Sequence, residues 1–261
     1  MSMKGKTALV TGSTSGIGAA MAAAFAAEGA NIVINGLGDA AEIEKGRDAL
    51  EKKYGVSVMY HGADMTRPDE IEDMVRSAEK RFGSVDVLVN NAGIQHTDPI
   101  EAFPVDRWNA VIAINLSAAF HAMRAALPGM QNRGWGRIIN IASAHGLVAS
   151  VNKSAYVAAK HGIVGLTKVA ALENAQSGIT CNAICPGWVK TPLVVAQIEA
   201  RAEKNGTSIE QETQALLLEK QPSGQFTTVE QLAGAAVFLC SDAASNMTGT
   251  TMTLDGGWTA Q

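Results

Sequence analysis

Residues Thr11–Gly18 read T-G-S-T-S-G-I-G, and this glycine-rich octet decides the fold. It follows a short apolar run and opens an alanine-rich segment of helical periodicity. Gly12 permits a tight turn, Gly16 lets the backbone approach an anion, and Gly18 lets a helix pack closely on a strand. Because the start of a helix presents free N–H groups, the octet predicts a strand, a diphosphate-binding turn and a helix. A plain tight turn is the alternative.

The rest of the chain alternates apolar runs with segments of helical periodicity. The runs are rich in Val, Ile and Leu without strict polar alternation, which is typical of parallel strands covered on both faces. They are Thr7–Thr11, Asn31–Asn35, Val56–His61, Val85–Asn90, Arg137–Ile141, Thr180–Pro186 and Thr251–Leu254. The helical segments are Gly16–Glu28, Ala40–Tyr54, Pro68–Phe82 with Thr66 as its N-cap, Asp106–Gln131 and Lys153–Gln176. We therefore expect one α/β domain over residues 1–261, built on a Rossmann-type, doubly wound parallel sheet.

One segment departs from this alternation. Residues Lys190–Lys220 form a long helical insertion of mixed polarity between the sixth strand and the segment Thr228–Cys240. Doubly wound sheets bind their ligands at the carboxyl ends of the strands, and this insertion leaves the sheet at that edge. We expect it to be a substrate lid over about residues 190–220.

Composition and charge exclude several classes of partner. The 261 residues are 47% hydrophobic and 18% charged, with a formal net charge of -4. Since no basic stripe occurs, nucleic acid and anionic membranes are not expected as partners. The sequence has neither an apolar signal core nor a run of about 18 apolar residues, so a cytoplasmic location is expected. Cys181, Cys185 and Cys240 lack framework or metal-ligand spacing, which indicates buried reduced thiols and no metal site.

The choice of dinucleotide depends on the residues that face its adenosine ribose. A 2′-phosphate requires Arg or Lys, but Ser13–Ser15 fill the glycine loop and Leu37 ends the second strand. The lack of a cation favours NAD. Because the usual acidic residue is also missing there, Asn35, Asp39 or the backbone remain open as partners of the ribose.

Two further strand ends suit a dinucleotide. Asp64 follows the third strand and can accept from the adenine amino group or cap a helix. The fourth strand ends N-N-A-G at Asn90–Gly93, where small residues allow a flat ring to lie close. Either asparagine can tie neighbouring strands through its amide, although the stretch is also compatible with a simple turn.

The segment from Ser143 to Lys160 carries groups suited to proton transfer. Tyr156 and Lys160 are four residues apart, so they share one helix face. An ammonium group about 4 Å from a phenol contributes roughly 4 kcal/mol at an effective dielectric of 20, or about three pKa units before any desolvation cost. The pair therefore predicts a general acid/base with a pKa near neutrality, and Ser143 can hold the reacting oxygen. A surface Tyr–Lys pair is the alternative.

Together these motifs resemble the short-chain dehydrogenase/reductase family. The resemblance extends from about residue 6 to Gly257 and includes Asn115, Y-V-A-A-K at 156–160 and P-G at 186–187. It implies a usually tetrameric oxidoreductase in which Asn115, Ser143, Tyr156 and Lys160 are catalytic. Lys160 would also bind the nicotinamide ribose, and Asn115 would support Lys160 through a water. The resemblance assigns cofactor binding to Gly12, Thr14, Ser15, Gly16, Ile17, Gly18, Leu37, Ala63, Asp64, Met65, Asn91, Ala92, Gly93, Tyr156, Lys160, Pro186, Gly187, Val189 and Thr191.

The residues around the proton-transfer groups indicate an anionic substrate. Ser143 and His145 point to the same side if the strand end stays extended, while Lys153 precedes Tyr156 by three residues on one helix stripe. His145 and Lys153 should therefore flank the reacting oxygen. A solvated lysine and an ordinary loop histidine are the alternatives.

Three stretches narrow the resemblance to family members that oxidise (R)-3-hydroxybutyrate to acetoacetate with NAD. They are I-Q-H-T from Ile94, S-A-H-G-L-V-A-S from Ser143 and P-G-W-V-K-T-P-L from Pro186. This resemblance assigns Gln95, His145, Lys153 and Gln197 to the substrate carboxylate, beside Ser143 and Tyr156. Trp188 and Trp258 are expected either to wall the methyl end of the substrate or to pack in the core. A 3-oxoacyl thioester reductase would instead need NADPH-binding cations and an open cleft. A non-catalytic dinucleotide sensor would have a broken Ser/Tyr/Lys set, whereas this set is intact.

Overall fold

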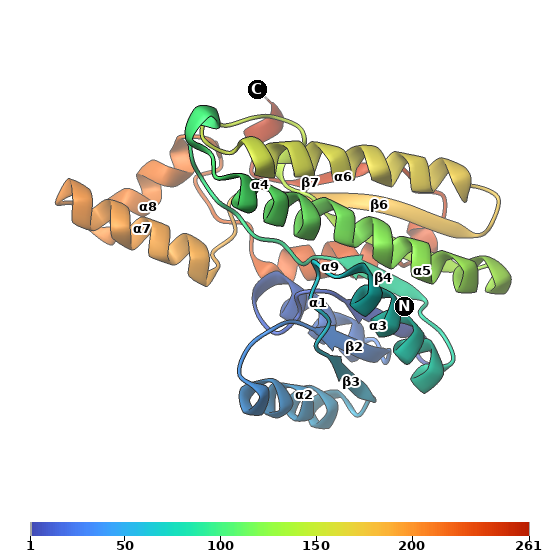
Figure 1. Ribbon diagram of the computed structural model, residues 1–261. Helices are drawn as coiled ribbons and strands as arrows, with labels where there is room; N and C mark the ends of the chain where they lie inside the picture. The colour runs from blue at the N-terminus through green and yellow to red at the C-terminus, as the bar shows by residue number, and fades with distance from the viewer. Residues whose placement is uncertain (1, 261) are drawn as a thin grey trace.

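Seven parallel strands form one sheet in the computed structural model, which describes residues 2–260 (Figure 1). The strands are β1 (Thr7–Val10), β2 (Asn31–Asn35), β3 (Val58–His61), β4 (Val87–Asn90), β5 (Gly136–Ile141), β6 (Ile179–Pro186) and β7 (Thr251–Leu254). Their order is β3-β2-β1-β4-β5-β6-β7, so the direction of winding reverses between β1 and β4. The predicted doubly wound sheet is confirmed, and a ligand site is expected at this reversal.

Helices cover both faces of the sheet. They are α1 (Gly16–Ala27), α2 (Ala40–Tyr54), α3 (Pro68–Phe82), α4 (Val105–Ile112), α5 (Ala118–Arg133), α6 (Ser154–Glu173), α7 (Pro192–Asn205), α8 (Ile209–Leu218) and α9 (Val229–Leu239). Successive residues of one strand belong to two different cores. In β1, Val10 packs in the core that contains α1 and α9, while Leu9 packs in the core that contains α3 and α5. Both faces are buried, which explains why the strands read as continuous apolar runs.

The predicted helix Asp106–Gln131 is confirmed, within a continuous helical stretch Val105–Arg133, but it is not α-helical throughout. The chain is α-helical over α4 and α5, but the residues between them, Ala113–Ser117, form a π-helical turn. Asn115 lies in this turn, and its side-chain amide exchanges two hydrogen bonds with the backbone of Ile94, at 2.9 and 3.0 Å. The π-helical turn thus coincides with hydrogen bonds from Asn115 to the loop that follows β4.

The stretch Val105–Arg133 is long and apolar enough to cross a membrane by length and composition. It is the one such candidate among the described residues, and 39% of its most apolar window is buried. A core helix passes the same test, so this stretch is weak evidence for a membrane span.

The predicted N-cap of α3 is also wrong. Arg67 occupies the N-cap position, and Pro68 begins the helix. Thr66 instead donates its backbone N–H and its hydroxyl to Asp64 Oδ1, at 2.8 and 2.9 Å. The short Asp64 side chain therefore organises the turn after β3.

The predicted helical insertion is present as α7 and α8. Figure 1 shows this helix pair projecting away from the sheet and its covering helices. The pair has a small apolar core of its own, formed by Val194, Ile198 and Leu216 and extended by Trp188 and Phe226. The helical insertion is thus confirmed, and its role as a substrate lid stays a prediction.

The three cysteines are free and buried, as predicted.

We predict that Gly18→Ala destabilises the fold by about 1–3 kcal/mol, because the new Cβ has no room. It would lie 2.4 Å from the Gly12 carbonyl oxygen and 2.5 Å from Asn91 Nδ2. Gly46 provides the matched control, since it is exposed in α2 and a Cβ there meets nothing within 4 Å. Gly46→Ala should stabilise by about 0.5–1 kcal/mol. Urea unfolding measures both changes, and equal stability of the two variants would contradict the packing argument.

Candidate active site

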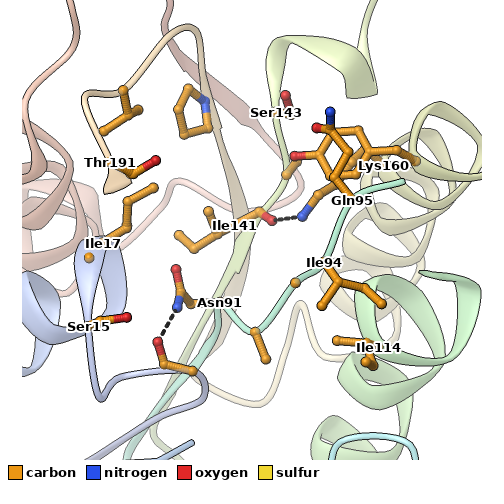
Figure 2. A pocket seen from close by; sticks show the side chains of 18 of the residues that line it. Ser15, Ile17, Asn91, Ile94, Gln95, Ile114, Ile141, Ser143, Lys160 and Thr191 are labelled. Atoms are coloured by element: carbon orange, nitrogen blue, oxygen red, sulfur yellow. Dashed lines mark hydrogen bonds between the residues drawn. The ribbon is translucent and has the colours of Figure 1, made fainter. Parts of the chain in front are cut away.

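A cavity of about 640 Å³ opens along the carboxyl ends of the central strands. It extends from the glycine loop to Trp258, and its volume is within the usual range for a site that holds a small molecule. Figure 2 shows Ser15 and Ile17 at one side of this cavity and Ser143, Gln95 and Lys160 at the other. The sheet thus brings residues distant in sequence into one site.

The glycine loop has the geometry that its sequence predicts. Gly12 and Gly16 both have left-handed backbones, with φ of 61° and 57°. A Cβ on Gly12 would lie 2.9 Å from the Ala92 Cα, so the close approach of the two strand ends requires glycine there. Ser15 is the N-cap of α1 and its side chain makes no capping bond within the described chain. Its hydroxyl and the first N–H groups of α1 can therefore bind a phosphate.

Gly18 differs from the other predicted cofactor residues. It does not line the described cavity, whereas Gly12, Thr14, Ser15, Gly16 and Ile17 do. It lies behind the loop, where the missing side chain lets α1 pack against the Gly12 carbonyl.

The adenosine end of the cavity contains no spare polar side chain from β2. Asn35 Oδ1 accepts from Gly12 N at 3.2 Å, and its Nδ2 donates to the carbonyls of His61 and Ala63. The Asp39 carboxylate accepts from two N–H groups at the start of α2. Both side chains are therefore occupied by the fold, and exposed Leu37 borders the cavity.

Both asparagines of the N-N-A-G stretch tie strands together. Asn90 Nδ2 donates to Asn140 Oδ1 at 2.8 Å and links β4 to β5. Asn91 Nδ2 donates to the carbonyls of Thr11 and Gly12 at 2.9 and 3.0 Å, linking β4 to the loop after β1 (Figure 2). The edge of the sheet is therefore fixed by side chains at the point where winding reverses.

Ser143, Tyr156 and Lys160 meet at the end of β5. Lys160 is 4% exposed, and its Nζ donates to the Ile141 carbonyl at 2.7 Å (Figure 2). The Lys160 Nζ lies 5.5 Å from the centre of the Tyr156 ring. Tyr156 forms a hydrogen bond with the Ser143 side chain. The three predicted catalytic residues are thus brought together, and Asn115 lies in the π-helical turn behind them.

The electrostatics of this group differ from the prediction. Burial raises the pKa of Tyr156, and the bond with Ser143 lowers it only in part. Burial also lowers the pKa of Lys160 to about 8. The expectation that Lys160 brings the pKa of the phenol near neutrality is therefore wrong in direction, because burial raises this pKa and Ser143, not Lys160, is the group that partly offsets it.

His145 and Lys153 flank the same group, as predicted. The His145 ring lies edge-on to Tyr156, at 5.9 Å between ring centres, and its Nε2 is 2.9 Å from Ser150 Oγ. Burial, followed by the charge of Lys153, lowers the pKa of His145 to about 4, so this ring is neutral at pH 7. Burial lowers the pKa of Lys153 as well. No carboxylate within the described residues forms an ion pair with Lys153, whose charge is available to a ligand.

The remaining predicted substrate residues separate into two groups. Gln95, Trp188 and Trp258 line the cavity, and the two indoles are 5.8 Å apart with a 31° tilt. Gln197 is half-buried on α7 and is not among the residues that line the cavity. A contact between Gln197 and a substrate therefore stays a prediction.

Several cavity residues escaped the sequence analysis. They are Gly36, Ile94, Ile114, Ile141, Ala142 and Val194. The position of Ile141 and Ala142 directly before Ser143, at a strand end, could have identified them as cavity residues. The others have side chains without functional groups, so nothing in their chemistry indicated a role in the site.

Comparison with known proteins agrees with this geometry. A family model described as enoyl-(acyl carrier protein) reductase matches residues 12–259. The chain belongs to the short-chain dehydrogenase/reductase family. It is 61% identical over 259 residues to the D-beta-hydroxybutyrate dehydrogenase of Cupriavidus necator, covering 99% of this chain and 100% of that protein. It is 56% identical over 256 residues to the enzyme of the same name from Rhizobium meliloti, covering 98% and 99%.

A solved structure supports the same assignment. L-sorbose reductase from Gluconobacter frateurii, complexed with NADPH and L-sorbose, matches with a TM-score of 0.95 at 32% identity, covering 100% of this chain and 98% of that one. The chain described here is thus, like its relatives in the short-chain dehydrogenase/reductase family, an oxidoreductase that acts on CH–OH groups.

The lowered pKa of His145 predicts acid-sensitive stability. The folded enzyme takes up this proton near pH 4, whereas the unfolded chain takes it up near the ordinary value of about 6.5. Acidification therefore favours the unfolded chain, and the contribution present above pH 6.5 is lost as the pH falls toward 4. When the pH falls from 6.5 to 4.5, the free energy of unfolding of His145→Asn should therefore decrease by about 2 kcal/mol less than that of the wild type.

Urea unfolding at the two pH values measures this difference. The same acid-induced loss in His145→Asn as in the wild type would show that His145 is not the group responsible.

Proposed function

We propose that this enzyme reversibly oxidises (R)-3-hydroxybutyrate to acetoacetate with NAD. The observation that carries the proposal is Lys153, a half-buried cation without a protein carboxylate among the described residues. It lines the same cavity as Ser143 and Tyr156. An anion held beside the reacting carbon is the ligand that this arrangement suits. The high identity to two D-beta-hydroxybutyrate dehydrogenases favours a small hydroxy acid.

Tyr156 is proposed as the general acid/base. During oxidation its phenolate takes the proton of the substrate hydroxyl, while Ser143 holds the substrate oxygen through a hydrogen bond. Lys160 stabilises the phenolate and can donate to a ribose hydroxyl. Oxidised NAD supplies the hydride acceptor and a nearby positive charge, which offsets the effect of burial on the Tyr156 pKa.

The carboxylate of the substrate is proposed to lie between His145, Lys153 and Gln95. His145 acts as a neutral donor, because its pKa lies well below the working pH. Lys153 contributes the charge, and Gln95 contributes an amide N–H. Hydrogen bonds to charged groups contribute about 1.5–3 kcal/mol each, so two or three are enough to favour the acid over a neutral alcohol.

The distribution of charge supports NAD over NADP. Both cations that line the described cavity, Lys153 and Lys160, lie at the substrate end. Leu37 borders the adenosine end, where a 2′-phosphate would need a cation. Asp64 lines the same cavity and is proposed to accept a hydrogen bond from the adenine amino group. The same absence of cations makes an NADPH-dependent 3-oxoacyl thioester reductase the weaker alternative.

A homotetramer in the cytoplasm is the proposed form of the enzyme. Large apolar side chains are exposed on α4, α5 and α6, among them Trp108, Phe120, Val169 and Leu172. Exposed apolar side chains that cluster on a surface are typical of protein interfaces, so these helices are the proposed subunit interfaces.

A steady-state assay of reduced nicotinamide formation tests the function. NAD and NADP are each paired with the two enantiomers of 3-hydroxybutyrate, 2-hydroxybutyrate, malate and a neutral secondary alcohol. We expect the highest kcat/KM for NAD with (R)-3-hydroxybutyrate. A preference for NADP, or faster turnover of the neutral alcohol, would refute the proposal.

We predict that Lys153→Ala raises the KM for 3-hydroxybutyrate at least tenfold, or by about 1.4 kcal/mol. NAD affinity should be retained, because Lys153 lies at the substrate end of the cavity. Lys80→Ala, an exposed lysine on α3, is the control and should leave KM unchanged. An unchanged KM in Lys153→Ala would remove Lys153 from the carboxylate site.

A further inference from the structure

Gln221 is a buried amide for which the proposed chemistry has no use. Only 1% of the residue is exposed, although glutamine is rarely found so deep inside a protein. Both ends of its side chain are bonded. Oε1 accepts from the backbone N–H of Trp188 at 2.8 Å, and Nε2 donates to the Gln225 carbonyl. A buried amide held this completely fixes the position of whatever it binds.

Two glycines make room for this side chain. A Cβ on Gly187 would lie 2.4 Å from Gln221 Oε1, and a Cβ on Gly256 would lie 2.5 Å from Gln221 Cγ. Gly187 directly precedes Trp188, and Gly256 is two residues before Trp258. The Gln221 side chain is therefore wedged between the backbones that carry the two tryptophans.

These tryptophans form one wall of the cavity. Trp188 and Trp258 pack against each other, and Trp258 also lies edge-on to His145, at 5.1 Å between ring centres. The indole N–H of Trp188 is buried and has no hydrogen-bond partner among the described residues. No hydrogen bond of its own orients this ring, so its position depends on its apolar packing and on its backbone.

The backbone of Trp188 is held from both sides. Gln221 binds its N–H, and its carbonyl accepts from Thr227 N at 2.9 Å. Gln221 also belongs to the end of the lid, because its own N–H donates to the carbonyl of Leu217 in α8 at 2.7 Å. The lid, the loop after β6 and the C-terminal segment therefore meet at one side chain.

We propose that Gln221 is a positioning residue that sets the Trp188–Trp258 wall and so limits the chain length of the hydroxy acid. The proposal rests on the proposed function, because it takes a small hydroxy acid as the substrate. Loss of the amide frees the Trp188 backbone, the wall moves outward, and longer 3-hydroxy acids gain access.

Gln221→Met tests this proposal, because methionine has a similar length but forms no comparable hydrogen bonds. The ratio of kcat/KM for 3-hydroxybutyrate to that for 3-hydroxyhexanoate should fall at least tenfold, while the Kd for NAD stays within twofold. Gln214→Met makes the same change at an exposed position of α8 and should keep the wild-type ratio. An unchanged ratio in Gln221→Met would overturn the proposal.

A second variant separates positioning from folding. Gln221→Glu keeps an acceptor for the Trp188 N–H. Burial beside the Gln225 carbonyl favours the protonated carboxyl, which donates to that carbonyl in place of the amide N–H. This variant should therefore keep the chain-length ratio within about threefold of the wild type. A loss in Gln221→Glu as large as that in Gln221→Met would show that the bond to Trp188 is not the cause.

Amide hydrogen exchange of Trp188 gives a readout that requires no substrate. In the full-length NAD-bound enzyme, this N–H should be protected, and Gln221→Met should remove the protection while Gln214→Met keeps it. Rapid exchange in the wild type would overturn the proposal even if Gln221→Met did not fold. Failure of the wild type to oxidise 3-hydroxybutyrate would instead refute the proposed function and leave this result intact.

Discussion

A buried ammonium group at the end of β5 is the constraint on which the rest of this site depends. Lys160 donates to the Ile141 carbonyl from a position that is almost free of solvent. Such a group is costly to bury and needs a fixed partner. The backbone carbonyl oxygen of Lys160 also lies close to Gly146, because a Cβ added to Gly146 would be only 2.7 Å from this oxygen. Helix α6 is thereby seated on the turn after β5, which places Tyr156 beside Ser143.

The same dry environment acts on each neighbouring titratable group. Burial raises the pKa of Tyr156 and lowers the pKa values of His145, Lys153 and Lys160. All four shifts favour the neutral form. A substrate carboxylate would bring a negative charge beside Lys153. A cationic nicotinamide would bring a positive charge beside the phenolate of Tyr156. The proposed substrate and cofactor thus complement the site in charge.

The five central strands, β2, β1, β4, β5 and β6, could be predicted from the sequence because each is an apolar run that is almost wholly buried, whereas the edge strands β3 and β7 are only partly buried. The parts that depend on distant contacts could not. The π-helical turn at Asn115 depends on bonds to Ile94, and no local pattern reveals them.

The chemistry shows the same division. Spacing placed Tyr156 and Lys160 on one helix face, but the direction of the Tyr156 pKa shift depends on burial, which spacing does not show. Gln221 binds the backbone of Trp188, 33 positions away, and nothing in the sequence around this single glutamine indicates that contact.

Direct titration of Tyr156 tests the central claim most directly. Tyrosinate absorbance is followed against pH for the wild type and for Tyr156→Phe, each with and without saturating NAD, and the difference isolates one phenol. Without NAD, Tyr156 should ionise only above its ordinary pKa of about 10. With NAD, the midpoint should fall by about 1–3 units. The same midpoint under both conditions, or ionisation near neutrality without NAD, would contradict the account.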